Sequence, residues 1–430
     1  MPVNIFWFRR DLRISDNHGL YQALRAGPKV LPVFIFDENI LNKLSPDDKR
    51  MPFIHYYVSE LDRELRKYGS SLYIKWGDPL KIFNELCELL EVADVYTNED
   101  YEPYAKVRDE SISKLLASKG KKLYYFSDQL IFKPGEILKP NGKPYEMFTP
   151  FSRKWIEKYT SETKKYYPVN EHLNNLYLHR GSSVPKLENI GFNSAFNNFP
   201  TNQLPLDKIA DYSLTRDYPS MDATTHLGPH LRFGTISIRR VASIANEYSS
   251  TWLNELIWRE FFMHILAFFP HVVQNSFKSK YDDIAWINDE KMFEQWMKGE
   301  TGYPLVDAGM REMMSTGFMH NRVRMVAASF LVKHLLIDWR WGEACFAANL
   351  LDFDLSSNNG NWQWVAGCGT DAAPYFRIFN PTRQQESFDP NFVYIRKWIP
   401  EFGTAEYPDS IVDHEYARER CINAYKKALI

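Results

Sequence analysis

Short apolar runs alternate with longer amphipathic stretches over the first 130 residues of the chain. Five runs rich in branched and aromatic residues predict buried strands: Val3–Phe8, Val30–Phe36, Ser71–Lys75, Val92–Thr97 and Lys122–Phe126. Between them, apolar positions recur with a helical period over Phe53–Tyr68, Leu80–Glu91 and Tyr104–Ser118. Repeated strand–helix–strand units predict a parallel sheet covered by helices, so residues 1–130 are expected to form an α/β domain.

A Rossmann-like sheet of this kind binds its ligands at the carboxyl ends of the strands. The first predicted strand is not followed by G-x-G-x-x-G, the usual dinucleotide fingerprint. The sheet alone therefore does not establish a nucleotide site.

Residues 131–205 differ in character and predict a long connector between two domains. Within them, residues 161–205 hold eight Asn and four Pro and show little periodicity. Phe and Leu residues in the same stretch can anchor it, which favours an ordered connection over the surface instead of a flexible tether.

From residue 206 to residue 430 the pattern predicts an all-α domain. Apolar positions are spaced near 3.6 residues, and no convincing strand or internal repeat is found. The predicted helices are Ile236–Tyr248, Trp252–Phe268, Glu290–Lys298, Leu305–Ser315, Met319–Leu336, Trp341–Leu351 and Ile411–Ala428.

Composition narrows the function classes. The 430 residues carry a net charge of -2, which excludes a generally basic coat but leaves room for a local basic groove. Aromatic residues make up 15% of the chain, and nine of the 12 Trp lie from Trp252 onward. The four Cys are scattered, no signal-peptide pattern is present, and the longest apolar stretch, Met325–Ile337, is interrupted. We expect a cytoplasmic protein with no membrane span.

Polar groups stand on helices that should bury apolar side chains. Glu255, Trp258 and Arg259 are spaced i, i+3 and i+4, so they share one helix face. A carboxylate beside an indole on an apolar helix is costly unless it meets a partner. The alternative to a functional site is a structural Glu–Arg pair.

A second helix carries Asn321, Arg324, Met325 and Ala328 on one face. An amide, a guanidinium and a thioether together suit a planar polar ligand. The residues alone favour the alternative, a helix end with ordinary surface arginines.

The segment LLDFDLSSNNGNWQWVAGCGTDAAPYFRIFNP is the most informative. Asn358 and the adjoining Asn and Gly permit left-handed backbone and close approach of a ligand. Asp352 and Asp354 lack a further ligand at suitable spacing, so no metal site is expected. In ATTHLGPHLRFG, Thr224 and Thr225 precede a helix predicted to begin near Pro229, a weak phosphate-site pattern that many helices share.

Over nearly its full length the chain resembles the photolyase/cryptochrome family, and within it the class I cyclobutane pyrimidine dimer photolyases. The resemblance extends from FWFRRDLRISDN to FNPTRQQESFDP. Between them, TTHLGPHLRFG, WLNELIWREFF, GYPLVDAGMREM, HNRVRM and NNGNWQWVAGCGTDAAPYFRIFNP follow in the family order.

The resemblance implies a helical domain that binds FAD, reduced in its active form. Residues that match the family's FAD contacts are Tyr212, Thr224, Thr225, His226, Leu227, Gly228, Trp252, Glu255, Arg259, Asn321, Arg324, Asp352, Asp354 and Asn358. Gly228 stands where relatives often have Ser, so a backbone contact replaces a hydroxyl contact there. Asn358 matches the position that faces flavin N5.

The resemblance also implies a light-driven carbon–carbon lyase, a deoxyribodipyrimidine photolyase. Excited reduced flavin donates an electron to a dimer flipped out of UV-damaged DNA, the cyclobutane ring opens, and the electron returns. Catalytic positions are matched by Glu255, Asn321, Met325 and Asn358. Trp258 and Trp364 match residues that pack on the flipped bases, and Arg216, Arg322 and Arg377 match residues that contact DNA phosphates.

Trp286, Trp339 and Trp362 match the family's electron-transfer chain from the surface to the flavin. Core packing explains any one of these indoles, but three in register with the flavin motif favour the chain. A second, light-harvesting chromophore is possible in this family. Tyr104 and Ala105 replace the Asn and Glu expected in folate-binding members, which disfavours folate and leaves a deazaflavin, another flavin or none.

Three alternatives are weighed against repair of cyclobutane dimers by a monomer. A cryptochrome-type blue-light photoreceptor would use the same flavin without repair, but cryptochromes usually alter the lesion-site positions that here keep the repair type. A (6-4) photolyase would be expected to carry histidines where HNRVRM stands. A helical redox flavoprotein without a light function leaves Trp286, Trp339 and Trp362 unexplained.

Overall fold

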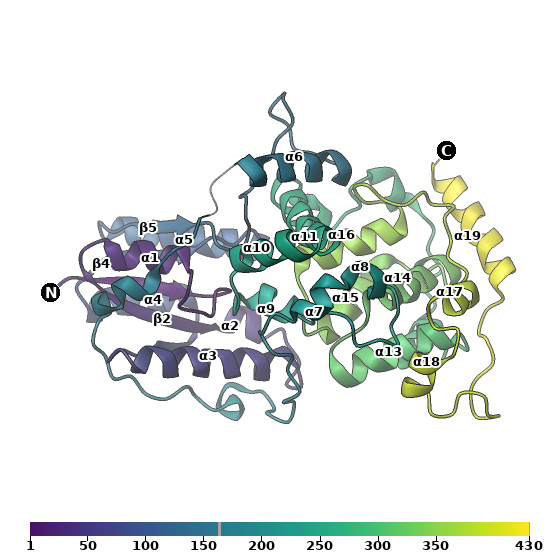
Figure 1. Ribbon diagram of the computed structural model, residues 1–430, viewed down its shortest axis with the longest axis horizontal. Helices are drawn as coiled ribbons and strands as arrows, with labels where there is room; N and C mark the ends of the chain where they lie inside the picture. Colours follow the sequence, from purple (N-terminus) through teal and green to yellow (C-terminus); the bar gives the residue numbers. More distant parts are fainter. Residues whose placement is uncertain (162–164, 430) are drawn as a thin grey trace. The chain divides into compact units, whose positions relative to one another are not determined.

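A computed structural model of the chain describes residues 1–161 and 165–429 (Figure 1). It divides into two compact units, each assembled from three segments. Unit 1 comprises Met1–Ile137, Lys154–Leu204 and His226–Glu247, and unit 2 comprises Leu138–Arg153, Pro205–Thr225 and Tyr248–Ile430. Residues 162–164, which belong to the expected connector, lie outside the described residues.

Unit 1 contains a five-stranded parallel sheet with strand order β3-β2-β1-β4-β5. The strands are β1 (Val3–Phe8), β2 (Lys29–Asp37), β3 (Tyr73–Gly77), β4 (Val92–Asn98) and β5 (Leu123–Phe126). The predicted α/β fold is confirmed, and each predicted strand overlaps an observed one. The order reverses between β1 and β4, so the crevice between their carboxyl ends is the topological switch point of the sheet.

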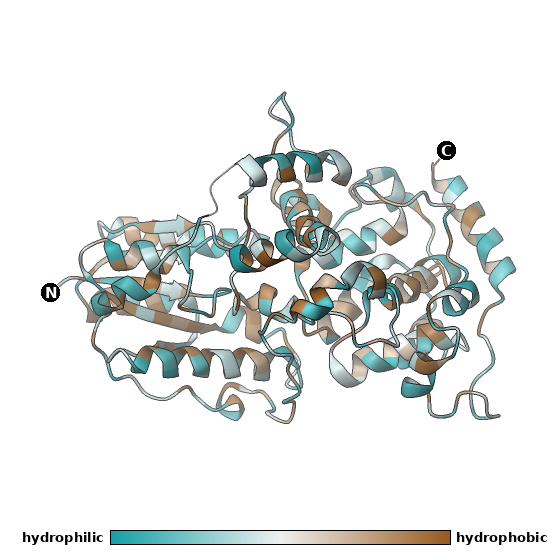
Figure 2. Ribbon diagram, in the orientation of Figure 1, coloured by the Kyte–Doolittle hydropathy of each residue, from teal (hydrophilic) through white to brown (hydrophobic). Residues whose placement is uncertain are grey.

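Apolar side chains project from both faces of the central strands, and helices cover the sheet and bury these side chains. The helices of unit 1 are α1 (His18–Arg25), α2 (Glu38–Leu41), α3 (Arg50–Arg66), α4 (Pro79–Leu89), α5 (Pro103–Ser118), α9 (Gly228–Phe233) and α10 (Ile238–Tyr248), with short 3-10 turns at Val169–Asn175 and Leu187–Ile190; α1, α2, α4 and α5 contact the strands. One core joins β1, β2 and β4 to the apolar faces of α4 and α5. Figure 2 shows β2 almost wholly brown, whereas α3 alternates brown and teal along its length.

Unit 2 is helical. Its helices are α7 (Leu206–Ala210), α8 (Tyr212–Thr215), α11 (Ser250–Phe268), α12 (Glu290–Lys298), α13 (Pro304–Thr316), α14 (Asn321–Ser329), α15 (Trp339–Asn349), α16 (Leu355–Ala366), α17 (Pro381–Phe388), α18 (Val393–Trp398) and α19 (His414–Leu429). Helix α6 (Phe148–Ser161) begins in unit 2 and ends in unit 1. A large apolar core joins α13, α14, α15 and α16.

Two differences between the structure and the sequence-based expectation bear on the candidate site. The helix predicted over Met319–Leu336 begins at Asn321 and changes at Phe330 into a π-helical turn that ends at His334. The Asn-Gly segment was expected to supply left-handed backbone, but Asn358 and Gly360 lie inside α16. A Cβ at Gly360 would lie 2.1 Å from Cδ1 of Phe262 on α11, so this glycine permits close packing of two helices.

We predict that Gly360→Ala destabilises the protein by about 1–3 kcal/mol, because the added methyl group overpacks the α11–α16 contact. Alanine is the better helix former by about 1 kcal/mol, so a loss of stability must come from the clash. Urea unfolding followed by circular dichroism measures the change. Phe262→Leu in the same chain should recover part of the loss, and a Gly360→Ala protein as stable as the parent contradicts the packing explanation.

Candidate functional site

Unit 2 encloses a cavity of about 360 Å³ whose walls come from α11, α14 and α16 and from the segment before α16. Predicted site residues on its walls are Arg216, Glu255, Trp258, Arg259, Asn321, Arg324, Met325, Asp352, Asp354, Asn358, Trp362 and Trp364. Ala328 also lines the cavity, on the face of α14 that its spacing predicted. Lining residues that the sequence analysis did not single out are Phe262, Phe346, Leu350, Phe353, Ser357, Asn361 and Val365. Segments more than a hundred residues apart in sequence thus form one site.

Helix α11 provides one wall of the cavity. Its N-cap Ser249 accepts a hydrogen bond from the Trp252 amide, which defines where the helix begins. From that start, Glu255, Trp258 and Arg259 all reach the cavity, as their spacing predicted. Phe148, which begins α6, stacks on the Trp258 indole with ring centroids 3.6 Å apart and planes 4° apart. No sequence signal linked Phe148 to Trp258, because they are far apart along the chain.

Glu255 has a charged partner that the sequence did not predict. Arg216, just after α8, donates a hydrogen bond to Glu255 Oε1 at 2.6 Å, with side chains 25% and 31% exposed. Burial raises the pKa of the Glu255 carboxyl, and the Arg216 guanidinium acts in the opposite direction. The structural Glu–Arg pair considered from the sequence therefore exists, but with Arg216 in place of Arg259.

Helix α14 provides a second wall. His320 caps it by accepting from the Arg322 amide. Asn321 is exposed, and its Nδ2 lies 4.0 Å from the Met325 sulfur one turn later. Arg324 donates through Nε to the Met319 carbonyl at 2.7 Å and through Nη2 to Asp352 Oδ2 at 2.9 Å. The guanidinium of Arg324 is therefore held in place across the cavity wall.

The third wall follows the Asp-x-Asp segment. Asp354 caps α16 by accepting from the Ser356 and Ser357 amides, which gives this aspartate a structural role. Asn358 donates through Nδ2 to the Glu343 carbonyl at 3.1 Å. The Glu343 carboxyl, beside α16, has its pKa raised to about 7 by burial. The amide of Asn358 is thus oriented by the backbone of α15.

The cavity fits a cofactor that combines flat apolar surface with polar edges. Its walls balance the cations Arg216, Arg259 and Arg324 against the anions Glu255, Asp352 and Asp354. Asp352 Oδ1 is buried and, among the described residues, makes no hydrogen bond. A buried acceptor without a donor costs free energy unless a ligand supplies one. The N–H edge of a flavin ring is such a donor, so these residues fit FAD.

Other predicted FAD contacts lie away from the cavity walls or in the other unit. Tyr212, Thr224 and Thr225 are half-buried in unit 2, and Trp252 is buried within α11. His226, Leu227 and Gly228 belong to unit 1. His226 has φ 52, and α9 begins at Gly228 after an N-cap Leu227 that makes no side-chain cap bond. The roles of these residues stay predictions.

The three tryptophans of the predicted electron chain share one region of unit 2. Trp362 lines the cavity, Trp339 is 1% exposed in the same apolar core, and Trp286 is half-buried against that core. The guanidinium of Arg340 lies 4.7 Å from the Trp339 ring centroid. Trp362 and Trp339 are thus buried and Trp286 is half-buried, an arrangement that suits electron transfer and core packing alike.

The predicted phosphate-binding arginines differ in their surroundings. Arg322 donates to Asp217 at 2.7 Å and its guanidinium lies 4.3 Å from the Phe388 ring centroid. Arg216 holds Glu255, as described above. Arg377 is exposed, and its guanidinium lies 5.8 Å from the ring centroid of Phe379.

In unit 1, the chain's own side chains fill the switch point of the sheet. Asn98, at the end of β4, donates to Asp11 Oδ2 at 2.6 Å, and the Arg9 amide donates to Asp11 Oδ1 at 2.7 Å. One terminal nitrogen of the Arg9 guanidinium, Nη1, donates to both carboxylate oxygens of Asp109 at 2.7 Å. Tyr104, singled out from the sequence, donates to Asp37 Oδ2 at 2.7 Å.

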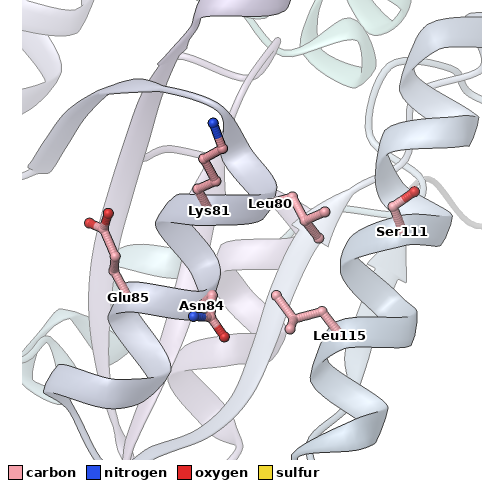
Figure 3. A pocket seen from close by; sticks show the side chains of 6 residues that line it. All are labelled: Leu80, Lys81, Asn84, Glu85, Ser111 and Leu115. Carbon is pink, nitrogen blue, oxygen red and sulfur yellow. The ribbon is translucent and has the colours of Figure 1, made fainter.

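Two hollows lie elsewhere on unit 1. One, of about 690 Å³, lies beyond the ends of β4 and β5 and is lined by Glu99, Asp100, Tyr101, Lys106, Asp109, Glu110, Ser113, Lys114, Tyr125, Lys133 and Pro134. The other, of about 540 Å³, lies between α4 and α5. Figure 3 shows its two leucines, Leu80 and Leu115, facing each other below the polar ends of Lys81 and Ser111. This mixture points to no particular ligand.

Within the described part of the chain, none of the helices is both long enough and apolar enough to cross a bilayer. Over the same residues, His, Cys, Asp and Glu side chains form no group of three or more that could hold a metal ion.

Comparison with known proteins identifies both halves of the chain. Residues 4–169 match the family model for DNA photolyase, and residues 252–406 match that for the FAD binding domain of DNA photolyase. A deoxyribodipyrimidine photo-lyase of Synechococcus sp. is 35% identical over 97% of this chain and 95% of its own length.

Solved structures agree. The archaeal photolyase from Sulfolobus tokodaii, whose structure holds two FAD molecules, has a TM-score of 0.82 and 33% identity over 99% of this chain and all of its own. The cryptochrome of Synechocystis sp. PCC6803 has a TM-score of 0.87 and 26% identity, with 99% of each chain covered.

These matches confirm the resemblance read from the motifs, the photolyase type of enzyme and the expectation of FAD as cofactor. The two-unit architecture, the FAD-compatible cavity and the full-length matches agree with one another. The chain therefore belongs to the photolyase/cryptochrome family and carries the FAD-binding domain of DNA photolyases.

Proposed function

We propose that the chain uses light to repair cyclobutane pyrimidine dimers in DNA, as a class I photolyase. The observation that carries this proposal is the gathering of Glu255, Trp258, Asn321, Met325 and Trp364 around one cavity. Two indoles, a carboxyl, an amide and a thioether provide flat apolar walls and hydrogen-bonding groups for a pair of pyrimidines. The relatives named as deoxyribodipyrimidine photo-lyases support the same function.

The reduced flavin, when bound, supplies the photoexcited electron that opens the cyclobutane ring. The protein's part is to bind, orient and exclude water. Asp352, held by Arg324, would accept a hydrogen bond from the flavin ring, and Asn358 would present a neutral amide to it. Arg259 would add a cation to the same pocket. Asp354 would act indirectly, because its carboxylate already caps α16.

The lesion would enter the cavity from flipped-out DNA, because a damaged pair costs least to unstack. Trp258, already backed by Phe148, would offer a rigid surface for stacking, and Trp364 would close the opposite contact. Glu255 and Asn321 would hydrogen-bond to the bases, and Met325 would touch the dimer. Arg216, Arg322 and Arg377 would neutralise phosphates on the flanking backbone.

Trp286, Trp339 and Trp362 would carry electrons inward to reduce oxidised FAD. Two observations support this proposal: Trp362 lines the cavity, and Trp286 is half-buried and so reaches the surface. A second chromophore, if bound, belongs to the α/β unit. The hollow beyond β4 and β5, which contains Tyr101 and Tyr125, suits a planar ligand better than the switch point that Asn98 and Asp11 fill.

We predict light-dependent loss of cyclobutane dimers from irradiated DNA once the flavin is chemically reduced and the sample is illuminated with blue or near-ultraviolet light. Chromatography of the digested DNA measures the dimers, and a dark sample is the control. Bound, reduced flavin without any repair in the light would reject the proposal. That outcome would favour the photoreceptor function found among cryptochromes.

We predict that Trp258→Ala weakens binding of dimer-containing DNA by about 1–3 kcal/mol, roughly 5- to 150-fold, because base–indole stacking is lost. Fluorescence anisotropy with a labelled duplex measures the change. Trp76→Ala is the matched control, since Trp76 lies on β3 of unit 1 and is 50% exposed. Equal weakening in both variants contradicts a lesion-stacking role.

We predict that Asp352→Asn weakens FAD binding by about 1.5–3 kcal/mol, roughly 10- to 150-fold, because a hydrogen bond to a charged acceptor and the partner of Arg324 are both altered. Flavin fluorescence on dilution measures the release of FAD. Asp283→Asn, at an exposed site, is the control. Unchanged FAD retention in Asp352→Asn would remove this residue from the proposed site.

We predict that Trp286→Phe slows photoreduction of oxidised FAD at least tenfold. Repair after chemical reduction should be unchanged, because Trp286 would only help to reduce oxidised FAD and chemical reduction bypasses that step. Flavin absorbance under illumination follows the first process and dimer loss the second. Trp341→Phe removes an indole that packs against the same core and should leave both rates unchanged. Loss of both rates in Trp286→Phe points to misfolding.

A further inference from the structure

Arg216 and Glu255 contact each other in the structure, but under the proposed function each would contact a different part of the DNA. Arg216 would contact a DNA phosphate, and Glu255 would contact a base inside the cavity. In this structure the two side chains instead bind each other at 2.6 Å. If Arg216 moves to a phosphate, Glu255 loses the hydrogen-bond donor that stabilises its charge.

The surroundings of Glu255 offer little to replace that donor. From the α8 side, Tyr212, Arg216 and Asp217 influence it, and Asp217 is an anion that disfavours a second charge nearby. Helix α16 carries no ionisable side chain, and the 3-10 turn Pro270–Val273 carries only His271. Two further cations line the cavity: Arg324 is paired with Asp352, and Arg259 lies one helical turn beyond Glu255 on α11. Of these three arginines, Arg216 is the one that hydrogen-bonds to Glu255 and lowers the pKa of its carboxyl, so the ionised form of Glu255 depends on Arg216.

A base that fills the cavity would also favour the protonated form of Glu255. Glu255 is 31% exposed and lines the cavity, so water in the cavity solvates its carboxylate. A base that enters would displace this water. Burial already raises the pKa of Glu255, and both the loss of water and the departure of Arg216 would raise it further.

We propose that bound damaged DNA draws Arg216 from Glu255 to a phosphate, and that Glu255 then takes one proton from solvent and donates it in a hydrogen bond to a carbonyl oxygen of the base in the cavity. This inference rests on the proposed function. No covalent bond changes: one solvent proton becomes bound to one carboxylate oxygen. A carboxylate can only accept hydrogen bonds, whereas a carboxylic acid can also donate one, so protonation lets Glu255 bind a base carbonyl.

The neighbouring ion pair between Arg322 and Asp217 is an internal control for the Arg216–Glu255 exchange. Arg322 is paired with Asp217 at 2.7 Å in the same way, and it is also expected to move to a phosphate. Asp217 is 39% exposed and does not line the cavity, so a base cannot desolvate it. Release of Arg322 should therefore leave Asp217 ionised, and only the Arg216–Glu255 exchange should take up a proton.

The test is calorimetric titration of the FAD-loaded protein with a duplex that contains one thymine dimer, in two buffers of different ionisation enthalpy. The difference in apparent enthalpy gives the protons bound. We expect an uptake approaching one proton per duplex near neutral pH. The uptake should fall at acidic pH, where Glu255 of the free protein already holds the proton. An undamaged duplex, which leaves the cavity open, should give much less uptake.

Three variants make the assignment specific. Glu255→Gln should bind the damaged duplex without proton uptake. Arg216→Gln should also lose the uptake, because Glu255 is already neutral in the free protein, and its salt dependence should lose about one phosphate contact, a slope change of ~0.9. Arg322→Gln should show the same change of slope but keep the uptake. Flavin absorbance verifies that each variant is folded and loaded.

The outcomes separate this inference from the proposed function. Preferential binding and light-driven repair of the dimer without proton uptake would overturn the inference alone, because Glu255 would then act as a carboxylate. Proton uptake that survives in Glu255→Gln would also overturn it. Absence of both preferential binding and light-driven repair would overturn the proposed function. An infrared carboxylic-acid band that appears on DNA binding and is missing in Glu255→Gln supports the inference independently.

Discussion

The cost of burying charge inside a helical core governs the organisation of unit 2. The cavity is framed by apolar helices, yet its walls hold three cations and three anions. An ion removed from water without a partner costs several kcal/mol, so these side chains must pair within the protein or through a ligand. Arg324 pairs with Asp352, Arg216 pairs with Glu255, and Asp354 caps α16. These ion pairs link the end of α8 to α11, and α14 to the segment before α16.

Helix geometry determines which parts of the site could be predicted from the sequence. Residues one helical turn apart, such as Glu255 with Trp258 and Asn321 with Met325, share a face by geometry, and the structure brings both pairs to the cavity. Contacts between distant segments carry no such local signal. The pairing of Arg216 with Glu255 and the stacking of Phe148 on Trp258 depend on the tertiary fold, and neither could be predicted from spacing.

In the fold, too, features set by local sequence could be predicted, whereas features set by tertiary packing could not. Strand positions were predicted well, because buried parallel strands read as continuous apolar runs. Helix α16 was missed, since Asn and Gly favour turns locally and the need for close packing against Phe262 is invisible in the sequence. At the end of α14, local periodicity predicted an uninterrupted helix, whereas the backbone widens into a π-helical turn whose residues are all buried. Tertiary packing decides the outcome at both places.

Paired arginines also reconcile a net charge of -2 with the proposed binding to DNA. In the free protein Arg216 and Arg322 are neutralised by Glu255 and Asp217, so a phosphate must compete with a carboxylate for each guanidinium. Undamaged DNA offers only the phosphates, and its net gain from each exchange is small. Under the proposed function, a flipped-out lesion would add stacking and burial within the cavity, and it would remove the water that favours an ionised Glu255. Discrimination would then arise because the Arg216 exchange is completed only when a base fills the cavity.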